Sequence, residues 1–103
     1  MGEKTKQFEQ DYARFVGTKY ALACNSGSSA NLLMVAAYTL RYGAGTVIVP
    51  AVAWSTSYSP FQQYGWKLVF VDVDFETLNY DPSSLWKAAE SYEFNLEQGL
   101  ALV

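Results

Sequence analysis

Residues 20–33, YALACNSGSSANLL, hold the transition around which the rest of the chain is arranged. The first five residues are mainly apolar and predict a buried β-strand from about Tyr20 to Cys24. Small polar residues and Gly27 follow, and a long helix is predicted from about Ser28 to Tyr42. The first amides of such a helix have no internal partner, and the helix dipole adds partial positive charge at the same place. The stretch therefore predicts an anion site, for which a phosphate group is a natural ligand.

A purely structural role for the same residues stays open. Asn25 and Ser26 are common N-cap residues, and Gly27 would also relieve backbone crowding. The hydroxyl groups of Ser28 and Ser29 would supply further donors to an anion. With one glycine the run is not a G-x-G-x-x-G fingerprint, and without a following lysine it is not a P-loop. The sequence thus leaves a plain helix cap and an anion-binding loop as the two interpretations.

Composition limits the class of protein. A length of 103 residues allows one small domain, and a hydrophobic content of 50% argues against disorder. The net charge of −3 and the lack of a basic run disfavour nucleic-acid binding. No apolar stretch is long enough to span a membrane and the N-terminus does not resemble a signal peptide, so we expect a cytoplasmic protein. The single cysteine, Cys24, can form no internal disulfide, and without histidine neither a histidine base nor a histidine metal site is available.

Helical and strand patterns alternate along the chain. Phe8, Tyr12 and Phe15 lie on one face of a helix predicted from about Thr5 to Val16. The later elements predicted are strands at about 46–49 and 67–73, a short helix at about 57–64, and a helix that starts with Asp81 as cap and Pro82 at its first position. The pattern weakens after about residue 92. This order predicts an α/β fold with a mainly parallel sheet.

Several short motifs occur in a specific order. They are Lys19–Ala23, Asn25–Leu32, Val47–Ala51, Trp54–Thr56, Val69–Asp74, Thr77–Asn79 and Asp81–Pro82. Together they make the region from Phe8 to Asp81 resemble the N-terminal part of the DegT/StrS-type nucleotide-sugar aminotransferases. These are fold-type-I enzymes that use pyridoxal 5′-phosphate (PLP). The resemblance implies a partial three-layer sandwich, with helices flanking the sheet, in which residues 1–103 form an incomplete N-terminal portion of the PLP-binding large domain.

The resemblance also implies roles for individual residues. Gly27 and Ser28 would bind the PLP phosphate through backbone amides and a hydroxyl group, with Ser29 nearby. Trp54 would stack on the pyridine ring, although a tryptophan in the core or in an interface is the alternative; Ser55 and Thr56 are weaker candidates. In the family, the lysine that holds PLP and the aspartate that pairs with its ring nitrogen lie well past position 103. We therefore expect no catalytic residue, no metal site and no covalent link to PLP in this chain.

The activity implied for a full-length relative is transfer of an amino group from an amino-acid donor to a keto group of a nucleotide-linked sugar. Such homo-oligomeric enzymes, typically homodimers, serve lipopolysaccharide, capsule or natural-product synthesis. Three alternatives remain: a PLP-dependent nucleotide-sugar 3-dehydrase, in which histidine replaces the lysine; a non-catalytic truncated chain that acts only through packing or association; and a nucleotide-binding α/β module. The lack of a glycine-rich fingerprint argues against the last.

The implied fold also predicts how this chain behaves by itself. In that fold the strand at 20–24 does not pair with the strand at 46–49, because strands from later sequence lie between them. We therefore expect a rearranged three-stranded sheet, association through open strand edges, or a loosely packed state.

Overall fold

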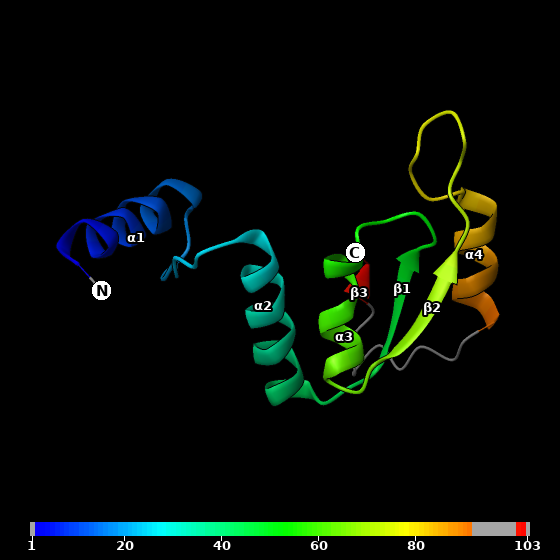
Figure 1. Cartoon of the computed structure of the whole chain (residues 1–103), viewed down its shortest axis with the longest axis horizontal. Coiled ribbons are helices and arrows are strands. Elements are labelled where there is room, and N and C mark those ends of the chain that lie inside the picture. The colour runs from blue at the N-terminus through cyan, green and yellow to red at the C-terminus, as the bar shows by residue number, and fades with distance from the viewer. Residues whose placement is uncertain (1, 92–100, 103) are drawn as a thin grey trace.

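The computed structural model describes residues 2–91 and 101–102. Figure 1 shows their arrangement, in which helices and parallel strands alternate from β1 onward as the sequence predicts. The elements are α1 (Glu3–Val16), α2 (Gly27–Tyr42), β1 (Thr46–Pro50), the 3-10 turn η1 (Ser55–Ser57), α3 (Ser59–Gln63), β2 (Lys67–Val71), α4 (Pro82–Ser91) and β3 (Ala101–Leu102).

The three strands form one parallel sheet in the order β2-β1-β3. β1 lies in the middle, with Thr46 opposite Lys67 and Pro50 opposite Val71 along β2. Its β-branched residues Val47, Ile48 and Val49 are fully buried. A strand of this kind is covered on both faces, which is the usual condition of a parallel strand in an α/β fold.

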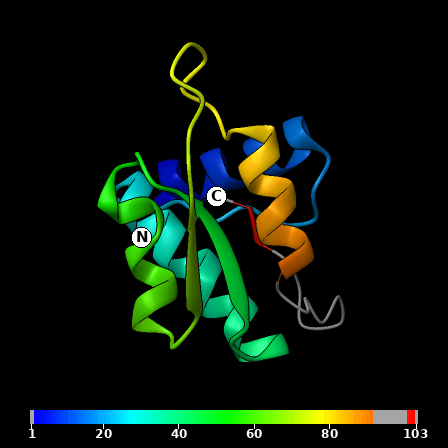
Figure 2. The same ribbon diagram turned by 90° about the vertical axis from the view of Figure 1, so that its right-hand side faces the viewer.

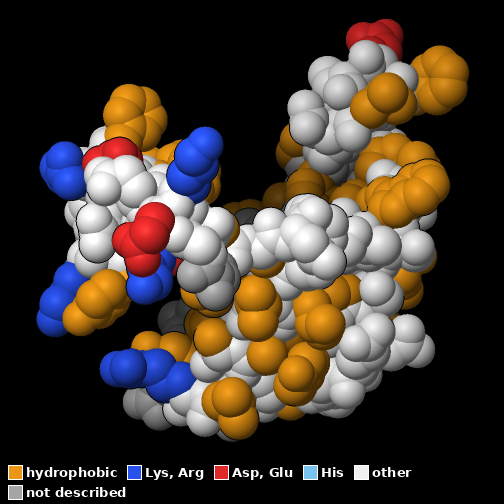
Figure 3. Space-filling view, turned by 60° about the vertical axis from the view of Figure 1, so that its left-hand side comes forward, with side chains coloured by type: hydrophobic (Ala, Val, Ile, Leu, Met, Phe, Trp, Pro, Cys, Tyr) orange, Lys and Arg blue, Asp and Glu red, His pale blue; other side chains and the backbone are white. Residues whose placement is uncertain are grey.

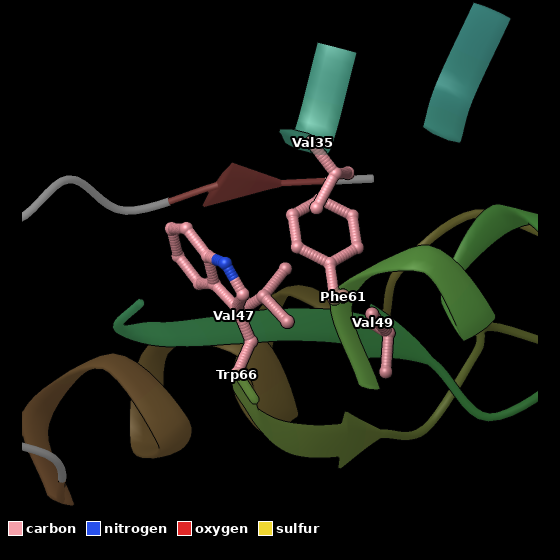
Figure 4. Packing of buried hydrophobic residues seen from close by; sticks show 5 residues of the cluster. All are labelled: Val35, Val47, Val49, Phe61 and Trp66. Carbon is pink, nitrogen blue, oxygen red and sulfur yellow. The ribbon is translucent and has the colours of Figure 1, made fainter. Parts of the chain in front are cut away.

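Helices cover both faces of the sheet, so the expected partial three-layer sandwich is confirmed. α2 and α3 lie on one side of the strands and α4 on the other (Figures 1 and 2). Alternate residues of β1 point to opposite layers. Figure 4 shows the first layer, in which Val35, Phe61 and Trp66 gather around Val47 and Val49. The second layer is built from Ile48, Val69, Val71 and Ala88.

The predicted ends of the helices agree with the structure. Gly17 caps α1 with a φ of 78°, in the left-handed region that glycine favours. Pro60 occupies the first turn of α3, where its missing N–H is harmless to that helix. Asp81 caps α4 through its carboxylate, which accepts a hydrogen bond of 2.9 Å from the amide of Ser84. Local signals of this kind need no distant partner, which is why they hold.

The predicted strand from Tyr20 to Cys24 is wrong. This segment is not part of the sheet, and the side chains of Tyr20 and Leu22 are 78% and 66% exposed. It is fixed instead to α1, because the amide of Ala23 donates a 2.8 Å hydrogen bond to the Glu9 carboxylate. A strand exists only beside another strand, and the sheet of the described residues contains only β2, β1 and β3, with no partner for this segment.

The apolar residues of α2 lie nearly all round the helix, which would predict burial on more than one side, and the structure does not bear this out. Val35 is its one buried residue, whereas Leu33, Met34 and Leu40 are exposed. α1 stands apart from the layered body (Figure 1), and the radius of gyration is 16.1 Å against about 13 Å for a compact chain of this length. The accessible surface of 7704 Å² likewise exceeds the roughly 5,800 Å² expected for a folded monomer of 11.5 kDa.

Candidate functional site

The start of α2 is an N-capped helix terminus. Ser26 has extended backbone angles, φ −162° and ψ 162°, and its hydroxyl oxygen accepts a 3.2 Å hydrogen bond from the amide of Ser29. Its carbonyl oxygen accepts from the amide of Ala30 at 3.0 Å. The capping role suggested by the sequence is therefore confirmed.

Capping does not use up the donors of this terminus. In the part of the chain that the structure describes, the amides of Gly27 and Ser28 have no acceptor, and both residues are exposed. A Cβ atom added at Gly27 would meet nothing within 4 Å, so relief of crowding is not the reason for this glycine. Two amides at the positive end of the helix dipole therefore face open space, and the cap and the anion-binding role are compatible.

The neighbouring side chains are arranged by hydrogen bonds within the loop. The hydroxyl group of Ser29 donates to the side-chain oxygen of Asn25 at 2.6 Å. The hydroxyl group of Ser28 makes no hydrogen bond to the described residues, and Ser28 is exposed. Ser29 is thus occupied in holding the loop, and Ser28 is the hydroxyl that remains available to a ligand.

A shallow hollow joins this loop to a second segment of the chain. Its volume is about 210 Å³, and it is lined by Ser28, Ser29, Leu32, Thr56, Ser59, Pro60 and Gln63. The start of α2 therefore lies beside η1 and α3, although Ser28 and Thr56 are far apart in sequence. Among the residues that the structure describes, no charged side chain lines the hollow. An anion bound here would be attracted by backbone amides and the helix dipole alone, which suits a phosphate held by a helix terminus.

Trp54 immediately precedes η1. Its carbonyl oxygen accepts a 2.9 Å hydrogen bond from the amide of Ser57, which starts the 3-10 turn. The Trp54 side chain is 78% exposed, so it is not part of the core that the described residues form. Its indole face remains free to cover a flat ring or a protein surface. Ser55 and Thr56 follow in the turn; Thr56 lines the hollow and Ser55 does not.

Sequence reasoning missed one residue of this region. The side-chain amide of Asn31 lies 3.4 Å from the carbonyl oxygen of Thr56 and links α2 to η1. The available signal was its spacing, since Asn31 falls one helical turn after Gly27 and so lies on the same side of α2. Among the described residues, the acidic and sulfur side chains form no cluster suited to a metal ion. None of the helices described is both long and apolar enough to cross a bilayer.

The sequence pattern of the DegT/DnrJ/EryC1/StrS aminotransferase family matches residues 1–93. The chain belongs to this family.

Individual relatives within the family have different activities. A GDP-4-keto-6-deoxy-D-mannose 3-dehydratase from Yersinia pseudotuberculosis is 50% identical over 93 residues, which cover 85% of this chain and 24% of the relative. A UDP-2-acetamido-2-deoxy-3-oxo-D-glucuronate aminotransferase from Pseudomonas aeruginosa is 34% identical, over 82% of this chain and 23% of the relative.

A solved structure is similar to this chain in its fold. The Escherichia coli GDP-4-keto-6-deoxy-D-mannose-3-dehydratase, with bound hydrated PLP, superposes with a TM-score of 0.75 at 52% identity, over 85% of this chain and 24% of that one. The chain therefore spans about a quarter of the length of the relatives that it matches.

Proposed function

We propose that this chain forms the phosphate-binding portion of a PLP-dependent enzyme that acts on a nucleotide-linked keto-sugar. The observation that carries the proposal is the exposed pair of amides at Gly27 and Ser28, which face open space at the start of α2. A helix terminus of this kind suits the phosphate group of the cofactor. When bound, PLP supplies an electron sink for chemistry at the carbon that carries an amino group.

The chain's own residues would hold and cover the cofactor. The amides of Gly27 and Ser28, with the Ser28 hydroxyl, would bind the phosphate, and Ser29 would keep the loop in shape through Asn25. Trp54 would lie on one face of the pyridine ring and exclude water from it. We also propose that the full enzyme is a homodimer with shared active sites. The exposed indole of Trp54 could then lie near the second subunit.

The reaction that we propose for the full enzyme is amino transfer from an amino acid to the sugar keto group. A second candidate is removal of the sugar 3-hydroxyl group. The observation that supports this candidate is the 50% identity to a 3-dehydratase. The residue at the position of the cofactor-binding lysine separates the two. Reading the gene beyond codon 103 should find lysine for the aminotransferase and histidine for the dehydratase.

Phosphate binding can be tested on the chain itself. Pyridoxamine 5′-phosphate is the better probe, because it lacks the aldehyde with which PLP reacts with any exposed lysine. In NMR spectra, millimolar pyridoxamine 5′-phosphate should shift the amide signals of Gly27 and Ser28, whereas pyridoxamine without phosphate should not. Equal shifts with both compounds, or none with either, would overturn the proposal for this chain.

A further inference from the structure

Asn31 bridges two segments that approach each other only in the folded chain. Its side-chain nitrogen Nδ2 donates to the carbonyl oxygen of Thr56 at 3.4 Å, across 25 residues of sequence, and the pair is partly buried. The distance exceeds the usual range of about 2.7–3.2 Å, so the hydrogen bond is a weak one. The bridge joins the first turns of α2 to η1, which are also in contact through the hollow that Ser28 and Thr56 line.

The carbonyl oxygen of Thr56 has a particular need for such a donor. Thr56 lies in a 3-10 turn, where the amide three residues later would be the donor, but no bond from Ser59 to this carbonyl forms among the described residues. The α-helical donor, four residues later, is also missing, because Pro60 has no N–H. The preceding carbonyl, that of Ser55, accepts from the amide of Tyr58 at 3.2 Å, and the carbonyl of Tyr58, two residues further on, accepts from that of Phe61 at 3.1 Å. A partly buried carbonyl without a donor is unfavourable, so the Asn31 amide fills a specific gap.

The consequence reaches Trp54. The turn that Asn31 holds begins at the Trp54 carbonyl, which accepts from the amide of Ser57. The Trp54 side chain is 78% exposed and gains little support from packing of its own. Its position relative to the start of α2 therefore depends on the backbone of η1, and the Asn31–Thr56 bond ties that backbone to α2.

We infer that Asn31 is a positioning residue. It supplies the donor that the backbone of the turn does not, and so fixes the Trp54 turn relative to the exposed amides of Gly27 and Ser28. Its effect on cofactor binding rests on the proposed function, whereas its effect on the turn does not. The two effects can therefore be measured separately.

The first measurement needs no ligand. Asn31→Leu removes the donor at similar volume. Gln63→Leu is its matched control, because Gln63 lines the same hollow and its side chain makes no hydrogen bond to the described residues. The backbone amides of Ser55 to Ser57 should become more mobile in heteronuclear NOE measurements of Asn31→Leu and stay unchanged in Gln63→Leu. Equal mobility in the wild type and Asn31→Leu would overturn the inference.

Rescue provides a more specific test. Pro60→Ala restores a backbone N–H that lies four residues after Thr56 and three after Ser57, and only a bond to Thr56 would replace the donor that Asn31→Leu removes. The double variant Asn31→Leu/Pro60→Ala should therefore recover much of the order that Asn31→Leu loses. A double variant as mobile as Asn31→Leu, in a chain that still shows the wild-type signals of β1, would show that the Thr56 carbonyl is not the point of action.

The last measurement concerns the ligand. Asn31→Asp keeps the shape of the side chain but replaces the donor, and Gln63→Glu adds the same charge beside the hollow. Affinity for pyridoxamine 5′-phosphate should fall three- to tenfold more in Asn31→Asp than in Gln63→Glu, the scale of one neutral hydrogen bond. Equal losses would overturn the link to binding. If the wild type does not bind, the proposed function fails for this chain, and the mobility measurements still decide the role of Asn31.

Discussion

The indole N–H of Trp66 donates a 2.7 Å hydrogen bond to the hydroxyl oxygen of Thr39 and so joins the last turn of α2 to the residue that precedes β2. Trp66 is only 4% exposed, and its ring also packs edge-on against Phe61. Since Val35 is the one fully buried side chain of α2, this bond is a main polar attachment of that helix to the body.

Thr39→Val should therefore destabilise the chain. The substitution keeps the side-chain volume but leaves the buried indole N–H without an acceptor, which costs about 1–3 kcal/mol. Urea unfolding followed by tryptophan fluorescence measures the change. Thr46→Val is the control, because Thr46 stands in β1, where valine is equally suited, and its hydroxyl makes no hydrogen bond in the described structure. Equal unfolding midpoints for Thr39→Val and the wild type would contradict the prediction.

The stability of α4 should depend on pH through Asp81. The side-chain hydrogen bonds of Ser83 and then of Ser84 lower the pKa of Asp81 from its ordinary 3.8 to about 2. Because the folded pKa is the lower one, the carboxylate stabilises the fold above pH 3.8 and this contribution is lost as the pH falls toward about 2. The amide signals of Ser84 and Leu85, measured against pH, should report the loss.

Two variants separate Asp81 from other carboxylates. Asp81→Asn keeps a capping oxygen but does not titrate, so the stability of α4 should depend less on pH in this range. Ser83→Ala removes the hydroxyl that donates to Asp81 at 2.7 Å, and the pKa of Asp81 should rise toward its ordinary value. An Asp81 titration that is the same in Ser83→Ala and the wild type would refute this account of the cap.

Trp54→Ala should weaken retention of PLP or pyridoxamine 5′-phosphate by about 1–3 kcal/mol, the scale of a lost aromatic contact. Trp86→Ala is the matched control, because Trp86 is also exposed, at 68%, but belongs to α4 on the opposite side of the sheet. Binding isotherms of the two variants measure the difference. Unchanged affinity in Trp54→Ala would mean that Trp54 does not contact the cofactor and has a role in folding or in association instead.

How much of the fold could be predicted depended on the distance over which each signal acts. The central strand was evident from the β-branched run Thr46–Val49, and the caps at Gly17 and Asp81 from single residues, because these signals act within a few positions. The segment Tyr20–Cys24 carries an equally apolar pattern but depends on a neighbouring strand. No local pattern reveals that the sheet of the described residues, β2-β1-β3, holds no partner for it.

The same distinction applies to the candidate site. The exposed amides of Gly27 and Ser28 follow from the helix start and could be predicted from the serine and glycine residues alone. The contact between Asn31 and Thr56 could not, because it depends on how the chain returns to α2 after β1. That Pro60 cannot donate to the Thr56 carbonyl can be read from the sequence. That Asn31 lies close enough to donate instead is known only from the packing of η1 against α2.

The exposed apolar surface predicts that the chain associates in solution. The side chains of Phe15, Leu40 and Phe75 are 86%, 86% and 92% exposed. In the view of Figure 3, charged side chains gather mainly on the part of the molecule that carries α1, whereas hydrophobic side chains are spread over the layered body. Surface of this kind marks an interaction site or a tendency to aggregate.

Sedimentation and thermal unfolding of the 103-residue chain test this prediction. We expect a mass above that of the 11.5 kDa monomer and a broad transition at modest temperature, because the buried core is small for the surface that it supports. Phe15→Gln and Leu40→Gln together should reduce the association without lowering the midpoint, since neither side chain is buried. Phe61→Ala, which empties a buried position, should lower the midpoint instead. A wild-type monomer with one sharp transition well above about 60 °C would mean that these residues form a self-sufficient domain despite their exposed apolar surface.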